Sequence, residues 1–375
     1  MTLTATAAQH DEGPVLLTGA TGFVGMELLV RVLEQTDRDV VALVRANDDE
    51  AARVRIDDLL KVLIAPSRRN AYRSRVQGVA SDLEQPGLGL SATTRAALVA
   101  SIGTVVHCAA SVSFTLELEE ARRINVEGTR EILRLAGDAH EHGSLDRFVH
   151  VSTAYVAGER RGRARERQGD VGQRFRNTYE RTKLEAERLV NDSGLPAAIL
   201  RPSVIVGDSV TGWTPSFNVI YWPLQAFARG LFDPIPGDAD APIDIVPVDV
   251  VANSLLELVR GPVRCGTFHV VASDDAVTNE HLATMAAEFF NSKPPRFAAP
   301  GEDPSAEMRA GPLVPYFRVR CVFDALRGRH VLGAKPPPLE EYFPALMRYA
   351  RDARWGKSPA ARWAVAGEPA LQRVA

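Results

Sequence analysis

Thr18-Gly19-Ala20-Thr21-Gly22-Phe23-Val24-Gly25 is the stretch that decides the fold. The apolar run Val15-Leu16-Leu17 precedes it and an apolar helical pattern follows it, so we predict a strand, a glycine turn and a helix. The first glycine permits a tight turn, the second lets the backbone approach a pyrophosphate, and the third lets the helix pack close to the strand. The helix N-terminus then presents unpaired N–H groups to the phosphates. The alternative is an ordinary glycine-rich turn, but the motifs further along the chain favour dinucleotide binding.

The composition of the 375-residue chain is that of a globular protein, with 45% hydrophobic and 24% charged residues. Its length exceeds one typical core, so we expect a main domain and a smaller one. The net charge of −3 does not indicate nucleic-acid binding, and three scattered cysteines have no metal or disulfide spacing. Residues 1–14 lack a signal-peptide pattern, and no apolar stretch approaches the roughly 18 residues of a membrane span. We therefore expect a cytoplasmic protein.

Apolar runs with the length of buried strands alternate with helical patterns through the first half of the chain. The predicted strands are 15–17, 39–44, 75–80, 103–108, 146–152 and 197–201, and the predicted helices include 48–64, 91–101, 117–140 and 177–191. Because strand and helix alternate, we predict an α/β fold with a doubly wound parallel sheet.

The pattern loosens after residue 207, which indicates a second, discontinuous domain. We assign 14–207 to the first domain and expect it to return at 241–272, through a strand at 243–248, a helix and a strand at 267–271. Residues 208–240 and 273–360 are assigned to a smaller substrate-binding domain, and 361–375 to a flexible tail. The segment 159–176 has neither a helical nor a strand period.

Tyr179 and Lys183 are four residues apart on a predicted helix and therefore share one face. A tyrosine phenol has a pKa of about 10, and a nearby cation favours its anion and lowers that value. This spacing also occurs by chance on solvated helices. However, Val149-His150-Val151-Ser152-Thr153 ends a strand, where open α/β sheets bind ligands, so the Thr153 hydroxyl can bond the carbonyl that Tyr179 protonates.

With these motifs in this order, the chain resembles the extended short-chain dehydrogenase/reductases over roughly residues 14–271. The resemblance implies a Rossmann fold and a catalytic set of Thr153, Tyr179 and Lys183, with Ser152 as the neighbouring hydroxyl. It also implies that Asn125 supports the lysine or a water. The open alternative for Asn125 is a helix residue that bonds its own backbone.

Two arginines suggest the phosphorylated form of the cofactor. In place of the acidic residue typical of NAD enzymes, the second strand ends in Val44-Arg45-Ala46, and Arg55 follows in the next helix. A guanidinium pairs with phosphate oxygens, so we predict NADPH. By resemblance, the further cofactor contacts are Asp82, Leu83, Cys108, Ala109, Ala110, Ser111, Ser152, Pro202, Ser203 and Val204, together with the glycine turn, Tyr179 and Lys183.

The substrate prediction also comes from the resemblance. Leu88-Gly89-Leu90-Ser91, Ser113-Phe114 and Thr211-Gly212-Trp213 are similar to thioester reductases and fatty acyl-CoA reductases, the male-sterility-type branch. This implies reduction of an acyl thioester, delivered by an acyl or peptidyl carrier protein or by coenzyme A, to an aldehyde. Whether a second hydride then yields the alcohol stays open. Relatives include monomers and homodimers.

Two features stay open. The segment 159–176 holds seven arginines against three acidic residues and could meet a pantetheine phosphate or an acidic carrier, or be a solvated loop. A group of large apolar residues could wall an acyl tunnel or be the core of the small domain. Its members are Trp213, Phe217, Tyr221, Trp222, Leu224 and Phe227.

Two other functions compete with this interpretation. The enzyme could act on a ketone, a secondary alcohol or a sugar nucleotide, although Arg45 and the aromatic second region argue mildly against sugar nucleotides. Alternatively, the chain could be a non-catalytic NADP sensor. Such proteins often lose the tyrosine or the lysine, and this chain keeps both.

Overall fold

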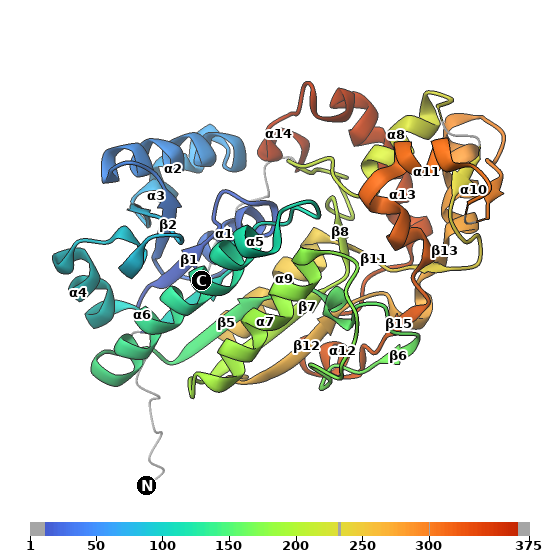
Figure 1. Cartoon of the computed structure of the whole chain (residues 1–375). Helices are drawn as coiled ribbons and strands as arrows, with labels where there is room; N and C mark the ends of the chain where they lie inside the picture. Colours follow the sequence, from blue (N-terminus) through green and yellow to red (C-terminus); the bar gives the residue numbers. More distant parts are fainter. Residues whose placement is uncertain (1–11, 232–233, 300, 367–375) are drawn as a thin grey trace, which may run out of the picture.

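A seven-stranded, all-parallel sheet forms the centre of the computed structural model, which describes residues 12–231, 234–299 and 301–366 (Figure 1). The order of the strands across the sheet is β3-β2-β1-β4-β5-β7-β12. Their bounds are β1 Val15–Thr18, β2 Val40–Arg45, β3 Val76–Ser81, β4 Thr104–His107, β5 Arg147–Val151, β7 Ala197–Pro202 and β12 Gly266–Val270. The predicted doubly wound α/β fold is confirmed.

Helices cover both faces of the sheet. On one face lie α1 Phe23–Gln35, α2 Asp49–Leu63 and α9 Val248–Arg260, and on the other α4 Ala92–Ser101, α6 Gly128–His142 and α7 Thr178–Asp192. The short α3 Pro66–Arg73 follows α2. Side-chain caps begin several of these helices, since Asp48, Ser91 and Asn177 each accept a backbone N–H from the first turn.

The helix predicted over 117–140 is interrupted. It consists of α5 Leu118–Arg122, a π-helical turn at Arg123–Glu127 and α6. A π turn accommodates one extra residue and is often found at functional sites. Here it contains Asn125, which is buried.

Beside the sheet, short strand pairs and helices form a second region, seen at the right of Figure 1. The strand pairs are β6 Gly162–Ala164 with β15 Cys321–Phe323, β8 Val204–Val206 with β11 Ile245–Pro247, β9 Ile235–Pro236 with β14 Phe297–Ala298, and β10 Pro242–Ile243 with β13 Val277–Thr278. The helices are α8 Tyr221–Ala228, α10 Asn279–Phe290, α11 Pro304–Ala310, α12 Leu326–Leu332 and α13 Leu339–Asp352. A hydrophobic core of its own joins this region to residues 154–164.

Two expectations are corrected. The apolar run 243–248 does not return to the main sheet, because β11 pairs with β8 and only β12 rejoins the seven strands. The expected tail 361–375 begins with a helix, α14 Arg362–Ala366, and the Arg362 guanidinium donates to the buried Glu27 carboxylate at 2.6 Å. Residues 367–375 lie outside the described part of the chain.

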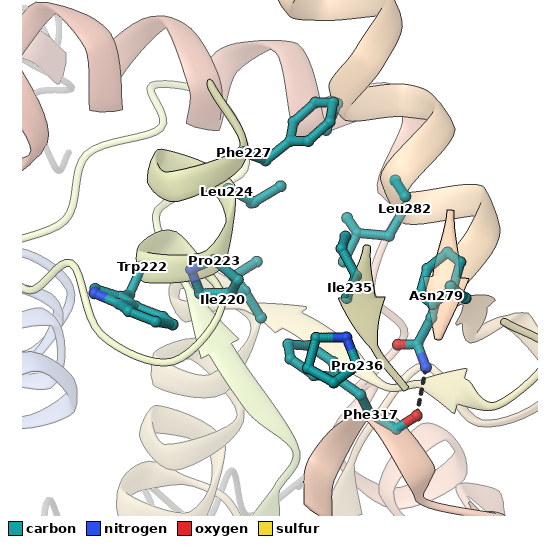
Figure 2. Close-up of a pocket in the computed structure, with 13 residues that line it drawn as sticks. Ile220, Trp222, Pro223, Leu224, Phe227, Ile235, Pro236, Asn279, Leu282 and Phe317 are labelled. Carbon is teal, nitrogen blue, oxygen red and sulfur yellow. Dashed lines mark hydrogen bonds between the residues drawn. The ribbon is translucent and has the colours of Figure 1, made fainter. Parts of the chain in front are cut away.

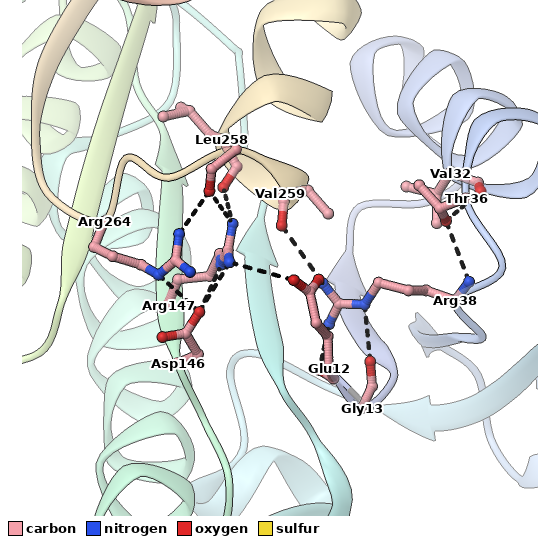
Figure 3. A network of polar contacts seen from close by, with 11 residues as sticks. Glu12, Gly13, Val32, Thr36, Arg38, Asp146, Arg147, Leu258, Val259 and Arg264 are labelled. Atoms are coloured by element: carbon pink, nitrogen blue, oxygen red, sulfur yellow. Dashed lines mark hydrogen bonds and ion pairs between the residues drawn. The ribbon is translucent and has the colours of Figure 1, made fainter. Parts of the chain in front are cut away.

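A polar network closes the amino-terminal edge of the sheet (Figure 3). Arg147, at the start of β5, is buried and donates to the carbonyl oxygens of Leu258 at 3.2 Å and Gly261 at 2.9 Å. Arg38 donates to the carbonyl oxygen of Gly13 at 2.8 Å. These bonds tie the end of α9 to the strand starts, and the cleft described below lies at the carboxyl edge.

Candidate functional site

The cleft begins where the strand order reverses, between β1 and β4. Open α/β sheets bind ligands at this point, outside the carboxyl ends of the strands. The two strand ends are joined by Thr18, whose hydroxyl lies 2.7 Å from Nδ1 of His107 and accepts the N–H of Ala109 at 3.1 Å. The cleft runs from here to Tyr179 and has a volume of about 880 Å³.

The glycine turn has the geometry predicted for it. Gly19 has a φ of 71°, and a Cβ there would lie 2.7 Å from the backbone nitrogen of Ala109. A Cβ on Gly25 would lie 2.1 Å from the carbonyl oxygen of Gly19, so the first turn of α1 can pack on the strand end only without a side chain. Gly22 precedes α1 and contributes no side-chain cap. The helix N-terminus is therefore open to an anion.

Tyr179, Thr153 and Lys183 come together in the same cleft. Thr153 follows β5 and lies beside the phenol of Tyr179, which is on α7. The Thr153 hydroxyl donates to the carbonyl oxygen of Pro202 at 3.4 Å. One turn further along α7, the Lys183 ammonium donates to the carbonyl oxygen of Val151 at 2.7 Å. The end of strand β5 thus contacts both Tyr179 and Lys183 on α7.

The sequence analysis expected the positive charge of Lys183 to lower the pKa of the Tyr179 phenol, and the structure does not show this effect. Burial raises the pKa of Tyr179 to about 12, against the opposing effect of the Thr153 hydroxyl beside it. Burial also lowers the pKa of Lys183 to about 8. Desolvation is the largest influence on both pKa values, because the Lys183 ammonium is hydrogen-bonded to strand β5 rather than to the Tyr179 phenol.

Two buried histidines lie beneath Lys183, and no sequence motif points to a role for them. The Lys183 Nζ lies 3.3 Å from Nε2 of His150, whose ring centroid is 5.4 Å from that of His107. Burial, followed by the positive charge of Lys183, lowers the pKa of both imidazoles, so both are neutral at pH 7. A neutral His150 can accept a hydrogen bond from the ammonium.

Asn125 neither reaches Lys183 nor bonds its own helix. Its side-chain oxygen accepts the N–H of Ser111 at 2.8 Å, and its amide donates to the carbonyl oxygen of Ser111 at 3.1 Å and to the hydroxyl of Thr182 at 3.0 Å. Asn125 therefore fixes the loop after β4 against α7, the helix that carries the tyrosine and the lysine.

Most of the predicted cofactor contacts line the cleft. Those that do are Gly19, Thr21, Gly22, Phe23, Val24, Gly25, Cys108, Ala110, Ser152, Tyr179, Lys183, Pro202, Ser203 and Val204. Ala109 and Ser111 belong to the same loop as Cys108 but do not line the cleft. Asp82 and Leu83 follow β3 at the carboxyl edge, where Leu83 packs near Gly128. Burial raises the pKa of the Cys108 thiol to about 12, so it stays protonated, as a core-filling cysteine would.

Arg45 and Arg55 lie together at the end of β2. Both are exposed, and Arg55 donates to the carbonyl oxygen of Arg45. Within the described residues neither guanidinium is ion-paired with a carboxylate, whereas the neighbouring Arg53 pairs with Glu50 and Asp57. The two unpaired guanidinium groups are available to an anion beside the strand end.

The cleft fits a dinucleotide. The bare turn at Gly22 leaves room for a pyrophosphate at the N-terminus of α1. Further along the cleft, the hydroxyl of Ser152 is buried and has no hydrogen-bond partner among the described residues. A buried polar group without a partner indicates a missing ligand or water. The ribose hydroxyls of a dinucleotide would satisfy both Ser152 and Lys183.

An aromatic wall faces the phenol of Tyr179, and its sequence signal is weak. The rings of Phe114 and Tyr179 lie 6.0 Å apart, and Phe114 stacks on Tyr316 at 5.0 Å. Tyr155 meets Tyr316 edge-on at 5.1 Å. Of these wall residues, the sequence motifs include only Phe114, as part of Ser113-Phe114. Tyr316 comes from a distant segment that no local pattern connects with the cleft.

The sequence left open the roles of the arginine-rich segment 159–176 and of the large apolar residues between 213 and 227, and the structure gives them different contacts. The segment 159–176 contains β6 and is held by Glu166, whose buried carboxylate accepts the N–H groups of His269, Arg327 and Gly328. None of its residues lines the cleft. Among the large apolar residues, Trp213 and Tyr221 are buried in the cores, whereas Trp222, Leu224 and Phe227 line a separate apolar pocket (Figure 2).

Neither metal chemistry nor a membrane span is indicated in the part of the chain that the structure describes. Its histidine, cysteine and carboxylate side chains form no cluster of three or more that could hold a metal ion. None of its helices is both long enough and apolar enough to cross a bilayer.

The fold and the cleft define a Rossmann-type protein that binds a nicotinamide dinucleotide. The model of the male sterility protein family matches residues 17–255, which is more than half of the chain. The chain therefore belongs to this family, a branch of the extended short-chain dehydrogenase/reductases.

Individual relatives agree with this assignment. "Fatty acyl-CoA reductase wat" of Drosophila melanogaster is 31% identical over 280 residues, covering 66% of this chain and 53% of that protein. A linear gramicidin synthase protein of Brevibacillus parabrevis is 33% identical over 251 residues, covering 65% of this chain and 5% of that protein. The terminal R domain from the myxalamid PKS-NRPS biosynthetic pathway superposes with a TM-score of 0.76 at 26% identity, covering 92% of each chain. The chain thus matches about half the length of the fatty acyl-CoA reductase.

Proposed function

We propose that this chain is an NADPH-dependent reductase of acyl thioesters. The observation that carries the proposal is the meeting of Thr153, Tyr179 and Lys183 in one cleft with the glycine turn of residues 19–25. Membership of the male sterility protein family and the likeness to a fatty acyl-CoA reductase and to an R domain support the acyl substrate.

Thr153 and Tyr179 act on the carbonyl oxygen of the substrate. A bound reduced nicotinamide would supply a hydride to the acyl carbon. The Thr153 hydroxyl and the Tyr179 phenol, which lie side by side, donate to the oxygen on which negative charge develops. The tetrahedral product loses the thiol and becomes an aldehyde. Reduction of the aldehyde to the alcohol would need a second NADPH as the hydride donor, together with one proton.

Lys183 and Asn125 have supporting roles. The Lys183 ammonium is anchored on Val151, and its remaining hydrogens can bond the ribose hydroxyls of the cofactor. Asn125 is a positioning residue, because it fixes the Ser111 loop against Thr182 on the helix of Tyr179 and Lys183.

Arg45 and Arg55 support NADPH rather than NADH. The end of the second strand is where this fold meets the ribose 2′ position of the cofactor. Two exposed guanidinium groups without carboxylate partners among the described residues suit a 2′-phosphate there.

Residues 208–240 and 273–360 form the substrate-binding part in this proposal, and the acyl group arrives on coenzyme A or on a carrier protein. The likeness to an R domain of a PKS-NRPS pathway supports the carrier.

The test is NADPH consumption with coenzyme A thioesters, carrier-bound acyl groups and ketones, with the products identified by mass spectrometry. We expect aldehyde or alcohol from the thioesters, and a loss of at least about a hundredfold in kcat for Tyr179→Phe. The matched control is Tyr72→Phe, because Tyr72 lies on α3 and does not line the cleft. Equal turnover by the wild type and Tyr179→Phe, or turnover of ketones alone, would contradict the proposal.

A further inference from the structure

Beneath Lys183 lies a buried side chain that takes no part in the proposed reaction, the imidazole of His150 on β5. Its Nε2 lies 3.3 Å from the Lys183 Nζ, and the carbonyl oxygen of Val151 accepts from the same ammonium at 2.7 Å. An ammonium group carries three hydrogens. These two acceptors on β5 therefore leave one hydrogen for the cleft that Lys183 lines.

Asn125, which the family resemblance assigned to the support of Lys183, is occupied elsewhere. Its side-chain oxygen accepts the N–H of Ser111, and its amide hydrogens bind the carbonyl oxygen of Ser111 and the hydroxyl of Thr182. Both kinds of polar atom in this side chain thus have partners. Asn125 leaves the support of the ammonium to strand β5.

The other titratable groups that lie near the ammonium among the described residues do not replace His150. They are Glu187 and Tyr179 on α7, His107 on β4 and Cys108 in the loop after β4. The Glu187 carboxylate is paired with Arg201, which donates to it at 2.8 Å. The ring nitrogens of His107 are hydrogen-bonded to the hydroxyls of Thr18 and Thr129. Burial raises the pKa of the Tyr179 phenol and of the Cys108 thiol to about 12, so both are neutral at pH 7.

The contact with Lys183 fixes the tautomer of His150. Its Nε2 can accept a hydrogen only if the ring proton is on Nδ1, and Nδ1 is buried without a hydrogen-bond partner among the described residues. Burial, followed by the charge of Lys183, holds the pKa of the ring well below its usual value, so the ring does not take the proton of the ammonium. A buried donor without a partner costs stability, and such a cost is typical of a functional position.

We propose that His150 is the positioning residue of Lys183, and that it directs the third hydrogen of the ammonium at the ribose of the dinucleotide. The inference rests on the proposed function and gives His150 the role that the resemblance gave to Asn125. A neutral amine has only two hydrogens, and the two acceptors on β5 take both of them. The contact with the cofactor is therefore lost when Lys183 loses its proton.

The first test requires neither substrate nor cofactor. In protein with isotope-labelled histidine, nitrogen NMR should show His150 with its proton on Nδ1, and the Nε2 signal should move in Lys183→Met. The signal is assigned by its loss in His150→Gln. A proton on Nε2 of His150 would overturn the proposal.

The second test is the affinity for NADPH as a function of pH, measured by calorimetry. His150→Leu removes a hydrogen bond to a charged group, so the dissociation constant of NADPH should rise about tenfold at pH 7. Loss of an acceptor also disfavours the charged form of Lys183. The decline of affinity with rising pH, which follows the Lys183 pKa of about 8 in the wild type, should therefore begin at a lower pH in His150→Leu. The kcat for acyl-coenzyme A reduction should fall while the KM for the thioester stays the same.

Two further variants serve as rescue and control. His150→Gln keeps an acceptor oxygen below the ammonium and should restore most of the affinity and its pH dependence. His269→Leu is the matched control and should bind NADPH as the wild type does. His269 is also a buried, neutral histidine of the main sheet with an unpartnered ring nitrogen among the described residues, but it lies on β12 and does not line the cleft.

The outcomes separate the two proposals. Equal NADPH affinity and equal pH dependence in His150→Leu and His269→Leu would contradict the role of His150. If the tautomer and the NADPH affinities are as expected but no acyl thioester is reduced, the proposed function fails and the role of His150 stands. Should His150→Leu not fold, the NMR comparison of the wild type with Lys183→Met still decides.

Discussion

The Nζ of Lys183 lies 3.3 Å from Nε2 of His150, a neutral histidine buried beneath the cleft. Together with the carbonyl oxygen of Val151 at 2.7 Å, this ring gives the ammonium acceptors on the side of the sheet. Two hydrogen bonds do not offset the loss of water around a buried charge, and burial lowers the pKa of Lys183 to about 8. The lysine is thus held charged at neutral pH at a cost in stability, as functional groups often are.

Replacing Lys183 should therefore change how stability depends on pH. The folded pKa of about 8 lies below the unfolded value of 10.5, so the unfolded state binds more protons between these two values. The free energy of unfolding of the wild type should rise from pH 8 to 10.5 by about 3 kcal/mol relative to Lys183→Met. Below pH 8 the difference between the two should be constant.

The measurement is urea denaturation of both proteins from about pH 7 to about pH 10.5, with the difference taken at each pH so that other titrating groups cancel. Lys183→Met should also lose NADPH oxidation. Parallel stability curves over the whole range would show that burial of the Lys183 ammonium does not destabilise the fold.

Arg45 and Arg55 should decide the choice of cofactor. Replacing both by alanine removes two exposed guanidinium groups that have no carboxylate partners among the described residues, so the KM for NADPH should rise at least tenfold while that for NADH stays the same. Steady-state kinetics with both cofactors provides the measurement. Arg53→Ala is the control, because Arg53 pairs with Glu50 at 2.5 Å and Asp57 at 2.7 Å. A wild-type preference for NADH would refute this prediction.

The parts of the fold and the site that depend on short stretches of neighbouring residues could be predicted from the sequence. Apolar runs of strand length and the glycine turn identified the sheet and its dinucleotide edge, because each is a short pattern with one dominant physical cause. The run at 243–248 has the same composition as a central strand, and nothing in it shows that its partner is β8 instead of the main sheet. The short strand β6 lies in the segment 159–176, which has no strand period, so its pairing with β15 also depends on distant residues.

Contacts between distant segments could not be predicted from the sequence. His150 lies under Lys183 only because β5 and α7 pack together, and Tyr316 reaches Phe114 from the far end of the chain. The sequence also singles out Asn125, but its π turn and its bond to Thr182 have no sequence signature. Each of these depends on tertiary packing, which overrides local preference.

Glu166 should prove to be structural despite the arginines around it. Its buried carboxylate accepts three backbone N–H groups, those of His269 at 2.9 Å, Gly328 at 2.8 Å and Arg327 at 2.6 Å. Glu166→Gln turns one acceptor oxygen into a donor, so the free energy of unfolding should fall by about 3 kcal/mol. Glu159→Gln, at an exposed position, is the control and should change it by less than about 0.5 kcal/mol. Equal urea midpoints for the two variants would indicate that this anchor is dispensable.

Gly25 and Gly137 form a matched pair for testing the glycine turn, since both are helical glycines. A Cβ at Gly25 would lie 2.1 Å from the carbonyl oxygen of Gly19, whereas a Cβ at Gly137, within α6, meets no described atom within 4 Å. Gly137→Ala should stabilise the protein by about 0.5–1 kcal/mol, because alanine loses less backbone freedom in a helix.

Gly25→Ala should instead push α1 away from the end of β1 and deform the site for the pyrophosphate. We expect at least a tenfold loss of NADPH affinity, measured by quenching of tryptophan fluorescence or by calorimetry, together with a lower Tm. Because the same substitution at Gly137 adds a methyl group without contact, any difference between the two variants reports the close approach of α1 to Gly19. If Gly25→Ala bound NADPH as tightly as Gly137→Ala, the turn would not be the phosphate site, and the position of the cofactor across the sheet would have to be assigned again.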